Sequence, residues 1–320
     1  MNKNDFSTAL SILIPVYNSE KTIERLVEGL IENLVSLYKL EIILVNDNSI
    51  DRSEEVCVSL FEKYREIVKF YSLSKNVGEH SAVMAGLNKA TGDFVVIMDD
   101  DFQNPVSEVV KLVNTAQENN YDVVYSYYDK KRHNVFRNMG SWFNDKAANL
   151  MLKKPKDLYL SSFKILNNFL VNEIIKYQAP FPYIDGLILQ ITDKIGTANV
   201  EHHERKEGSS GYTLRKLVSL WLNMFTNFSI LPLRVSIILG LVFASIGLLL
   251  GLKTAIEKII DPNVPVGFAS LLISISIFGG IQLIMLGMAG EYVGRIFLSL
   301  NKKPQYTIRK AYEYSESDSQ

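Results

Sequence analysis

The stretch VVIMDDDFQNP, from Val95 to Pro105, places three consecutive carboxylates directly after an apolar run with the composition of a buried strand. A single Asp here would be an ordinary turn residue or helix cap, because Asp is favoured in both. Three adjacent carboxylates repel one another, which favours either full solvation or a bound cation. Hard ions such as Mg²⁺ and Mn²⁺ take oxygen ligands of this kind. The stretch therefore predicts a strand followed by a candidate cation site.

Strand-like and helix-like segments alternate on both sides of this stretch, up to the region of Arg205. The predicted strands are residues 11–16, 41–46, 68–73, 94–99 and 122–127. The predicted helices, in which apolar residues recur at i, i+3 and i+4, are residues 21–38, 53–64, 80–90 and 107–119. This alternation is typical of an α/β fold with a mostly parallel sheet, in which ligands bind beyond the carboxyl ends of the strands.

Polar segments follow the first four predicted strands, at residues 15–20, 46–51, 75–82 and 99–105. They therefore predict one site at the carboxyl edge of the sheet. The sequence contains no GxGxxG after the first strand and no GxxxxGK[ST], so neither a dinucleotide cradle nor a P-loop is supported. A nucleotide bound at this edge would need a cation for its phosphates, and the carboxylates offer a place for one.

The overall composition narrows the classes of function. The formal net charge of -1 gives no global signal for nucleic-acid binding. The single cysteine, Cys57, excludes an internal disulfide, fits a reducing compartment and is expected in the core. Residues 1–10 lack the long apolar segment of a signal peptide.

Two long uncharged stretches, Val235 to Leu252 and Asn263 to Gly290, predict a pair of membrane helices. The alternative, two buried core helices, is weak because both stretches exceed the usual length of a core helix. Basic residues flank the pair: Arg215, Lys216, Arg234, Arg295, Lys302 and Lys303. The connecting loop region carries Lys253 and Lys258, so both termini are expected in the cytoplasm. Residues 213–231, which include Trp221, fit either an interfacial amphipathic helix or an ordinary helix on the soluble domain.

Several motifs carry a resemblance to a known family. They are PVYNSE (15–20), NDNSID (46–51), NVGEHSAVMAG (76–86) and the DxD within MDDDFQNP (98–105). Together they resemble the inverting family 2 glycosyltransferases, whose domain has the Rossmann-like GT-A fold. The segments EHHERKEGSSGYT (201–213) and GEYVGRIF (290–297), with the two spans, are similar to the polyprenyl-phosphate branch of that family.

The resemblance implies a role for each matching position. The nucleotide donor would be bound by Pro15, Tyr17, Asn18, Glu20, Asp47, Asn76, Gly78, Asp99 and Asp100. Mg²⁺ or Mn²⁺ would be held by Asp99, Asp101 and Gln103. The acceptor phosphate would be bound by Arg205, Arg137, Lys206 and Ser210. The residues implied as catalytic are Asp99, Asp101 and Arg205.

The sequence departs from the family pattern at two places. Gly211 stands where the polyprenyl-phosphate branch has Lys, and residues 155–166 are one residue out of register with an Asp-containing acceptor loop. Neither Asp157 nor Asp185 is therefore assigned as a catalytic base. His80 is expected to pack or to cap a helix, and His202 and His203 lack the spacing of a zinc site.

The resemblance implies a bacterial inner-membrane enzyme that moves one sugar, with inversion, from a nucleotide donor, expected to be UDP-linked, to undecaprenyl phosphate. Such an enzyme feeds cell-envelope glycan or lipopolysaccharide synthesis. The expected divisions are a cytoplasmic GT-A domain at 1–212, an interfacial segment at 213–231, two transmembrane helices within 232–292 and a cytoplasmic tail at 293–320. A non-catalytic membrane assembly protein that uses the same fold to bind partners is the alternative. The sugar is not determined by the sequence, and homo-oligomerisation stays open.

Overall fold

The computed structural model describes residues 8–102, 104–128, 158–201, 231–261, 267–301 and 303–314. Contacts divide the chain into two compact units, Met1–Gly211 together with Lys302–Gln320, and Tyr212–Asn301. Several predicted site residues lie outside the described residues: Gln103, Arg137, Arg205, Lys206 and Ser210. Asp157, His202, His203, Gly211 and residues 213–230 lie outside them as well.

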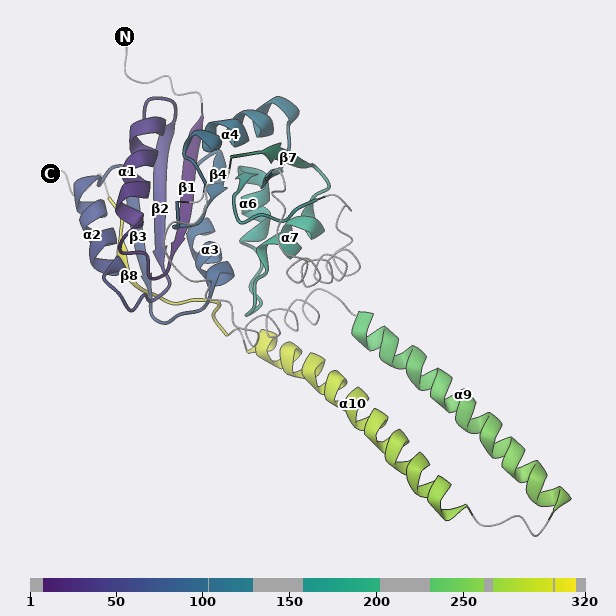
Figure 1. Ribbon diagram of the computed structural model, residues 1–320. Coiled ribbons are helices and arrows are strands. Elements are labelled where there is room, and N and C mark those ends of the chain that lie inside the picture. Colours follow the sequence, from purple (N-terminus) through teal and green to yellow (C-terminus); the bar gives the residue numbers. More distant parts are fainter. Residues whose placement is uncertain are drawn as a thin grey trace. The chain divides into compact units, whose positions relative to one another are not determined.

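An eight-stranded sheet in the order β7-β5-β6-β4-β1-β2-β3-β8 forms the core of the first unit (Figure 1). The strands are β1 Ala9–Val16, β2 Lys39–Asn46, β3 Val68–Leu73, β4 Phe94–Ile97, β5 Val123–Tyr127, β6 Lys164–Asn167, β7 Ile195–Asn199 and β8 Ile308–Tyr312. Strands β3, β2, β1 and β4 pair in parallel, whereas β6 and β8 run antiparallel to their neighbours. The predicted α/β fold with a mostly parallel sheet is confirmed, and β1 to β5 match the five predicted strands.

Helices cover both faces of this sheet. They are α1 Ile23–Leu34, α2 Ser53–Lys63, α3 Glu79–Leu87, α4 Ser107–Asn119, α6 Asn168–Ile174 and α7 Ile184–Ile191. Alternate side chains of β1, including Leu10 and Ile12, pack with α1, α2 and α4 in the main core, which also contains the buried Cys57. Leu13 points to the opposite face, where a Cβ on Gly86 of α3 would lie 2.0 Å from its Cδ1. Glycine at position 86 therefore allows α3 to approach the sheet closely.

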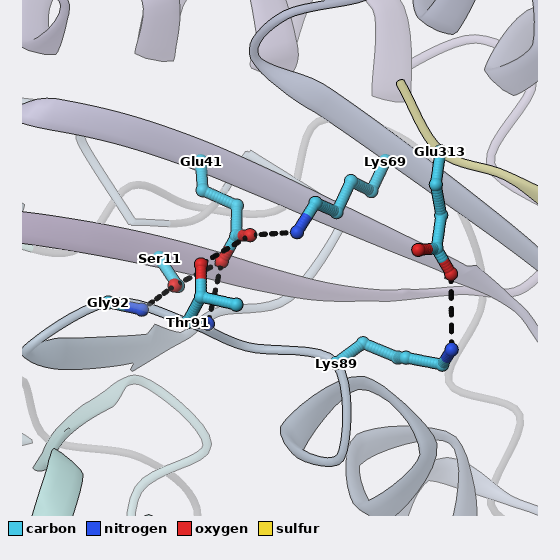
Figure 2. A network of polar contacts seen from close by, with 7 residues as sticks. All are labelled: Ser11, Glu41, Lys69, Lys89, Thr91, Gly92 and Glu313. Atoms are coloured by element: carbon cyan, nitrogen blue, oxygen red, sulfur yellow. Dashed lines mark hydrogen bonds and ion pairs between the residues drawn. The ribbon is translucent and has the colours of Figure 1, made fainter. Parts of the chain in front are cut away.

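A network of polar contacts ties together the starts of the parallel strands (Figure 2). Glu41 of β2 accepts hydrogen bonds from Ser11 Oγ at 2.5 Å and Thr91 Oγ1 at 2.9 Å, and it also pairs with Lys69 of β3. Although burial raises it, these contacts bring the pKa of Glu41 below its ordinary value, so the carboxylate stays charged. The amino edge of the sheet is therefore held by side chains, and the long loops lie at the carboxyl edge.

The C-terminal segment forms a strand that its sequence pattern does not predict. Residues 293–320 were expected to form a tail, but α10 runs to Leu300 and β8 pairs antiparallel with β3 at the edge of the sheet. Tyr312 of β8 stacks on Phe70 and contacts Phe61, with ring centroids 5.6 Å apart in both pairs. The chain thus returns to the first unit after its two long helices (Figure 1).

The second unit contains the two long helices, α9 Leu231–Ile260 and α10 Phe268–Leu300. By length and composition, Leu233–Ile260 and Ile277–Leu300 are candidate membrane spans. Large apolar side chains along both are exposed, for example Leu248 at 67% and Leu283 at 70%, so these are not core helices of a soluble domain. Ser236 of α9 contacts Met288 of α10, and a Cβ on Gly240 would lie 3.7 Å from Met285. The two helices are therefore antiparallel, and small residues of α9 lie at their contact.

Candidate active site

The loops at the carboxyl edge share an unusual backbone feature. Asn18, Asn48, Gly78 and Phe102 follow β1, β2, β3 and β4 respectively, and their φ angles are 57°, 54°, 88° and 64°. This left-handed region suits Gly and Asn but strains a residue with a bulky side chain. Phe102 is such a residue, and the centroid of its ring lies 5.4 Å from the Arg25 guanidinium carbon. Strain of this kind persists where surrounding contacts impose it, and it is common at functional sites.

The loop after β1 is bonded to the loop after β2. The Asn18 backbone N–H donates to Ser49 Oγ at 3.0 Å, and Asn18 Oδ1 accepts from the Ile50 N–H at 3.0 Å. Glu20 accepts from the Arg52 N–H at 3.1 Å. Two of the predicted donor-binding residues therefore hold the neighbouring loop in place, while the side chain of Tyr17 is 47% exposed at this edge.

Asp47 connects the loop after β2 to the loop after β3. It is 4% exposed, and its carboxylate accepts from the backbone N–H groups of Val77 at 2.7 Å and Gly78 at 2.9 Å. Burial raises the pKa of Asp47, and the two hydrogen bonds oppose that shift. Asp47 and Gly78, predicted as donor-site residues, are thus in direct contact, whereas Asn76 beside them is exposed.

The three consecutive carboxylates have different surroundings. Asp100 accepts from the Tyr17 backbone N–H at 3.0 Å and from the Ser19 hydroxyl, so it bonds the loop after β1. Burial, together with the charges of Asp99 and Asp101, raises the pKa of Asp100 to about 6 despite these bonds. Asp99 accepts from Ser162 Oγ at 2.5 Å. Asp100 therefore fixes the loop, and Asp99 and Asp101 are the DxD pair beside it.

A buried polar cluster behind the DxD was missed by the sequence analysis. Lys164 of β6 forms an ion pair with Asp185 of α7, and their side chains are 5% and 10% exposed. The Tyr125 hydroxyl donates to Asp185 at 2.9 Å, and Lys164 Nζ lies 5.2 Å from the Tyr125 ring centroid. The signal in the sequence was a lysine within the apolar run SSFKIL, but its partner is distant along the chain. Asp185 is thus engaged by a buried cation.

Glu79 and His80, at the start of α3, lie near this cluster. Partial desolvation and the negative charge of Asp99 raise the pKa of Glu79, although the residue remains exposed to solvent. Burial lowers the pKa of His80 to about 4, so its ring is neutral at neutral pH. His80 packs edge-on against Tyr183, with ring centroids 5.0 Å apart, in keeping with the packing role expected for it.

The donor atoms at this edge suit a hard cation. Within the described residues, no group of three or more His, Cys, Asp or Glu side chains is arranged to hold a metal ion. The DxD offers two carboxylates, and Mg²⁺ and Mn²⁺ commonly complete such a set with phosphate oxygens and water. The like charges that raise the pKa of Asp100 would be offset by a cation at the DxD. The residues present therefore fit a divalent cation bound together with a diphosphate.

A mostly parallel α/β sheet with a DxD after its fourth strand is the arrangement expected from the resemblance to glycosyltransferases of the GT-A fold. The chain belongs to glycosyl transferase family 2, whose family model matches residues 11–176. The resemblance seen in the sequence is therefore confirmed, and the chain is a glycosyltransferase. Family membership favours catalysis over the alternative of a non-catalytic assembly protein.

Two relatives that are similar along almost the whole chain share one name. The chain is 31% identical over 308 residues to the undecaprenyl-phosphate 4-deoxy-4-formamido-L-arabinose transferase of Photorhabdus laumondii, covering 94% of this chain and 93% of the relative. The transferase of that name from Edwardsiella ictaluri is 30% identical over 320 residues, with 98% of each chain covered. The similarity therefore includes the two long helices as well as the α/β unit.

Solved structures support the fold. Glucosyl-3-phosphoglycerate synthase from Mycobacterium tuberculosis, in complex with UDP, matches with a TM-score of 0.50 and 18% identity, covering 67% of this chain and 76% of that chain. The same enzyme in complex with Mn²⁺, UDP-glucose and phosphoglyceric acid matches with a TM-score of 0.50 and 18% identity, over 67% and 76% of the two chains. At this identity the match shows the shared GT-A fold.

Proposed function

We propose that this glycosyltransferase is anchored in the membrane and moves one sugar from a nucleotide sugar to undecaprenyl phosphate. The observation that carries the proposal is a GT-A carboxyl-edge site in the same chain as two long helices with exposed apolar side chains. The name of the relatives, which match over 94% of the chain, supports the lipid phosphate as acceptor. The complexes of the M. tuberculosis synthase with UDP and Mn²⁺ support a UDP-linked donor and a divalent cation.

The donor side of the reaction is assigned to the four loops at the carboxyl edge. Tyr17, Asn18 and Asp47 would surround the nucleoside, in loops already held by hydrogen bonds before the ligand arrives. Asp99 and Asp101, with Gln103, would hold Mg²⁺ or Mn²⁺. A bound cation would neutralise charge on the departing diphosphate. The role of this chain is to keep the carboxylates and the nucleoside loops in fixed positions.

The acceptor side needs positive charge more than a base. An oxygen of the lipid phosphate is already anionic near neutral pH, so it attacks the anomeric carbon as the bond to the diphosphate breaks, and the configuration inverts. Arg205 is assigned to hold this phosphate. Arg137, Lys206 and Ser210 are assigned to the same phosphate as supporting residues. The mechanism therefore needs no base, and Asp185 is not assigned as one, because its carboxylate is paired with Lys164.

Arg205→Ala is expected to lower transfer to undecaprenyl phosphate at least roughly tenfold, because a guanidinium can make two charge-assisted bonds to a phosphate, and tenfold corresponds to about 1.4 kcal/mol. Affinity for the nucleotide sugar should stay within about twofold of the parent, since Arg205 is assigned to the acceptor and not to the donor. Calorimetry with UDP and a lipid-transfer assay on the same preparation measure both quantities. Normal transfer, or parallel loss of donor binding, would move the acceptor role to Arg137 or Lys206.

The topology proposed is a cytoplasmic catalytic unit with a short external loop between the two spans. Strand β8 follows α10 and pairs with β3, so strands that precede α9 and the strand that follows α10 form one sheet. Their shared sheet supports an even number of crossings between them. The basic residues beside the spans favour the cytoplasm for that side. An epitope at Pro262 should be labelled from outside intact cells and a reporter after Gln320 should not. External labelling at Gln320 would contradict the topology.

The overall proposal is tested by incubating the purified protein with undecaprenyl phosphate, Mn²⁺ and a panel of UDP-sugars. Mass spectrometry then measures the mass of the lipid product. One sugar should be added per lipid. A product that grows by repeated addition, or no lipid product with any donor, would count against it.

A further inference from the structure

The strand that returns from the long helices is linked to the proposed donor site by a continuous set of hydrogen bonds. Lys310, in the middle of β8, donates to Glu54 Oε1 at 2.6 Å. The other carboxylate oxygen of Glu54 accepts from Ser72 Oγ at 2.7 Å and from Asn46 Nδ2 at 3.3 Å. Glu54 of α2 therefore connects the edge strand β8 to the end of β2.

Asn46 carries the connection into the loop that follows β2. It is fully buried, and its Oδ1 accepts from the Ser49 N–H at 3.1 Å and the Ser49 hydroxyl at 2.6 Å. Ser49 Oγ in turn accepts from the Asn18 N–H. The amide of Asn46 thus has donors on its acceptor side and acceptors on its donor side, which leaves one orientation satisfied. Asn46 Nδ2 also donates to Ser72 Oγ at 3.1 Å, so Glu54 and Ser72 set that orientation, and the adjacent residue is Asp47.

The charge of Glu54 matters for this arrangement, because the group accepts three hydrogen bonds and donates none. The hydrogen bond from Lys310 is the main cause that lowers the pKa of Glu54. An ionised carboxylate presents only acceptors, whereas a protonated or amide side chain would turn a donor toward Ser72 or Asn46. Lys310 therefore favours the form of Glu54 that the Asn46 amide requires.

We propose that Lys310 and Glu54 are positioning residues for the nucleotide donor, so that the segment following the membrane helices is part of the donor site. The inference rests on the proposed nucleotide-sugar function and adds to it a residue pair remote from the ligand. Neither residue touches the donor in this assignment; they act through Asn46 and Ser49 on the loops that contain Asp47 and Asn18.

A second ion pair, formed by the residue directly after β8, offers a matched control. Glu313 pairs with Lys89 at 3.1 Å, and the two side chains are 42% and 36% exposed (Figure 2). The Lys310–Glu54 pair is similarly placed, with 50% and 33% exposure. Both pairs hold the C-terminal segment against the sheet, but Lys89 precedes β4 at the amino edge, and its side chain forms no hydrogen bond or ion pair with the loops after β1 and β2 among the described residues. If loosening of β8 were enough to weaken UDP binding, breaking either pair would weaken it to the same extent.

The test is the dissociation constant of UDP with Mn²⁺, measured by calorimetry on the full chain in detergent. Lys310→Met should raise it about threefold, in line with an exposed ion pair. Glu54→Gln should raise it about tenfold, because the amide leaves buried groups mispaired. Lys310→Arg and Glu313→Gln should stay within about twofold of the parent, since one keeps the charge and the other lies elsewhere. The maximal transfer rate at saturating donor should be nearly constant across the set, so the effect falls on KM.

The outcomes separate this inference from the proposed function. If the parent binds UDP and Glu313→Gln weakens binding as much as Lys310→Met, or if neither Lys310→Met nor Glu54→Gln changes it, the positioning role is wrong while the function stands. If the parent does not bind UDP with Mn²⁺ at all, both are overturned. Melting temperatures are measured in parallel, and Lys310→Met, at a half-exposed site, is the variant expected to fold normally if Glu54→Gln does not.

Discussion

Asp101→Asn is expected to reduce sugar transfer by on the order of 100-fold or more, the scale seen when a group that stabilises developing charge is removed. An amide keeps the shape of the side chain but lacks the charge that would hold a divalent cation at the DxD. UDP binding should weaken in the variant when Mn²⁺ or Mg²⁺ is present, and should match the parent in excess chelator. A lipid-transfer assay and calorimetry, each with and without chelator, measure the two effects.

The control for this substitution is Asp193→Asn. Asp193 is an exposed carboxylate just before β7, outside the carboxyl-edge loops, and its loss should leave transfer within about twofold of the parent. Full activity of Asp101→Asn, or full activity of the parent in chelator, would remove the metal from the proposed mechanism while leaving the fold unaffected.

Lys164→Met is expected to destabilise the folded protein by about 3–5 kcal/mol, because it leaves the buried Asp185 without its cation. The side chains of the pair are 5% and 10% exposed, so water cannot compensate for the lost partner. Combining Lys164→Met with Asp185→Asn should recover part of the loss, since the uncompensated charge is then gone. Denaturant unfolding of the full chain in detergent, followed by tyrosine fluorescence in the α/β unit, measures these differences.

An exposed ion pair serves as the comparison. Lys176 and Glu173 are 2.5 Å apart with 66% and 35% exposure, and Lys176→Met should change stability by less than about 1 kcal/mol. If Lys164→Met were no more destabilising than Lys176→Met, the cluster behind the DxD would not be a structural ion pair, and a role for Lys164 in ligand binding would become the better explanation.

Much of the fold could be predicted because its signals are local. Strands β1 to β5 are apolar runs bounded by polar loops, and α1 to α4 repeat apolar residues at helical spacing, so each element is recognisable from its own residues. The parallel pairing of β1, β2, β3 and β4 then brings the polar loops to one edge, which is why the DxD and the Asp47 loop could be assigned to one site. The two apolar helices followed from length and absence of charge alone.

The elements that were missed depend on distant partners. Strand β6 contains Lys164, a charge that looks unsuited to a buried strand until Asp185 of α7 is placed beside it. Strand β8, with the sequence IRKAY, carries a polar pattern that is also compatible with a solvated tail. Its pairing with β3 and the packing of Tyr312 on Phe70 join segments far apart in sequence.

The sequence by itself therefore determined the class of fold, the carboxyl-edge loops, the apolar helix pair and the family, because periodicity, charge and motif spacing are properties of short stretches. The tertiary structure alone decided that Asp100 bonds the first loop, that Lys164 neutralises Asp185 and that Lys310 reaches Glu54. Each of these contacts depends on which strands become neighbours. A side chain's hydrogen-bond partner is set by the geometry of the packed sheet, which no single segment of the chain contains.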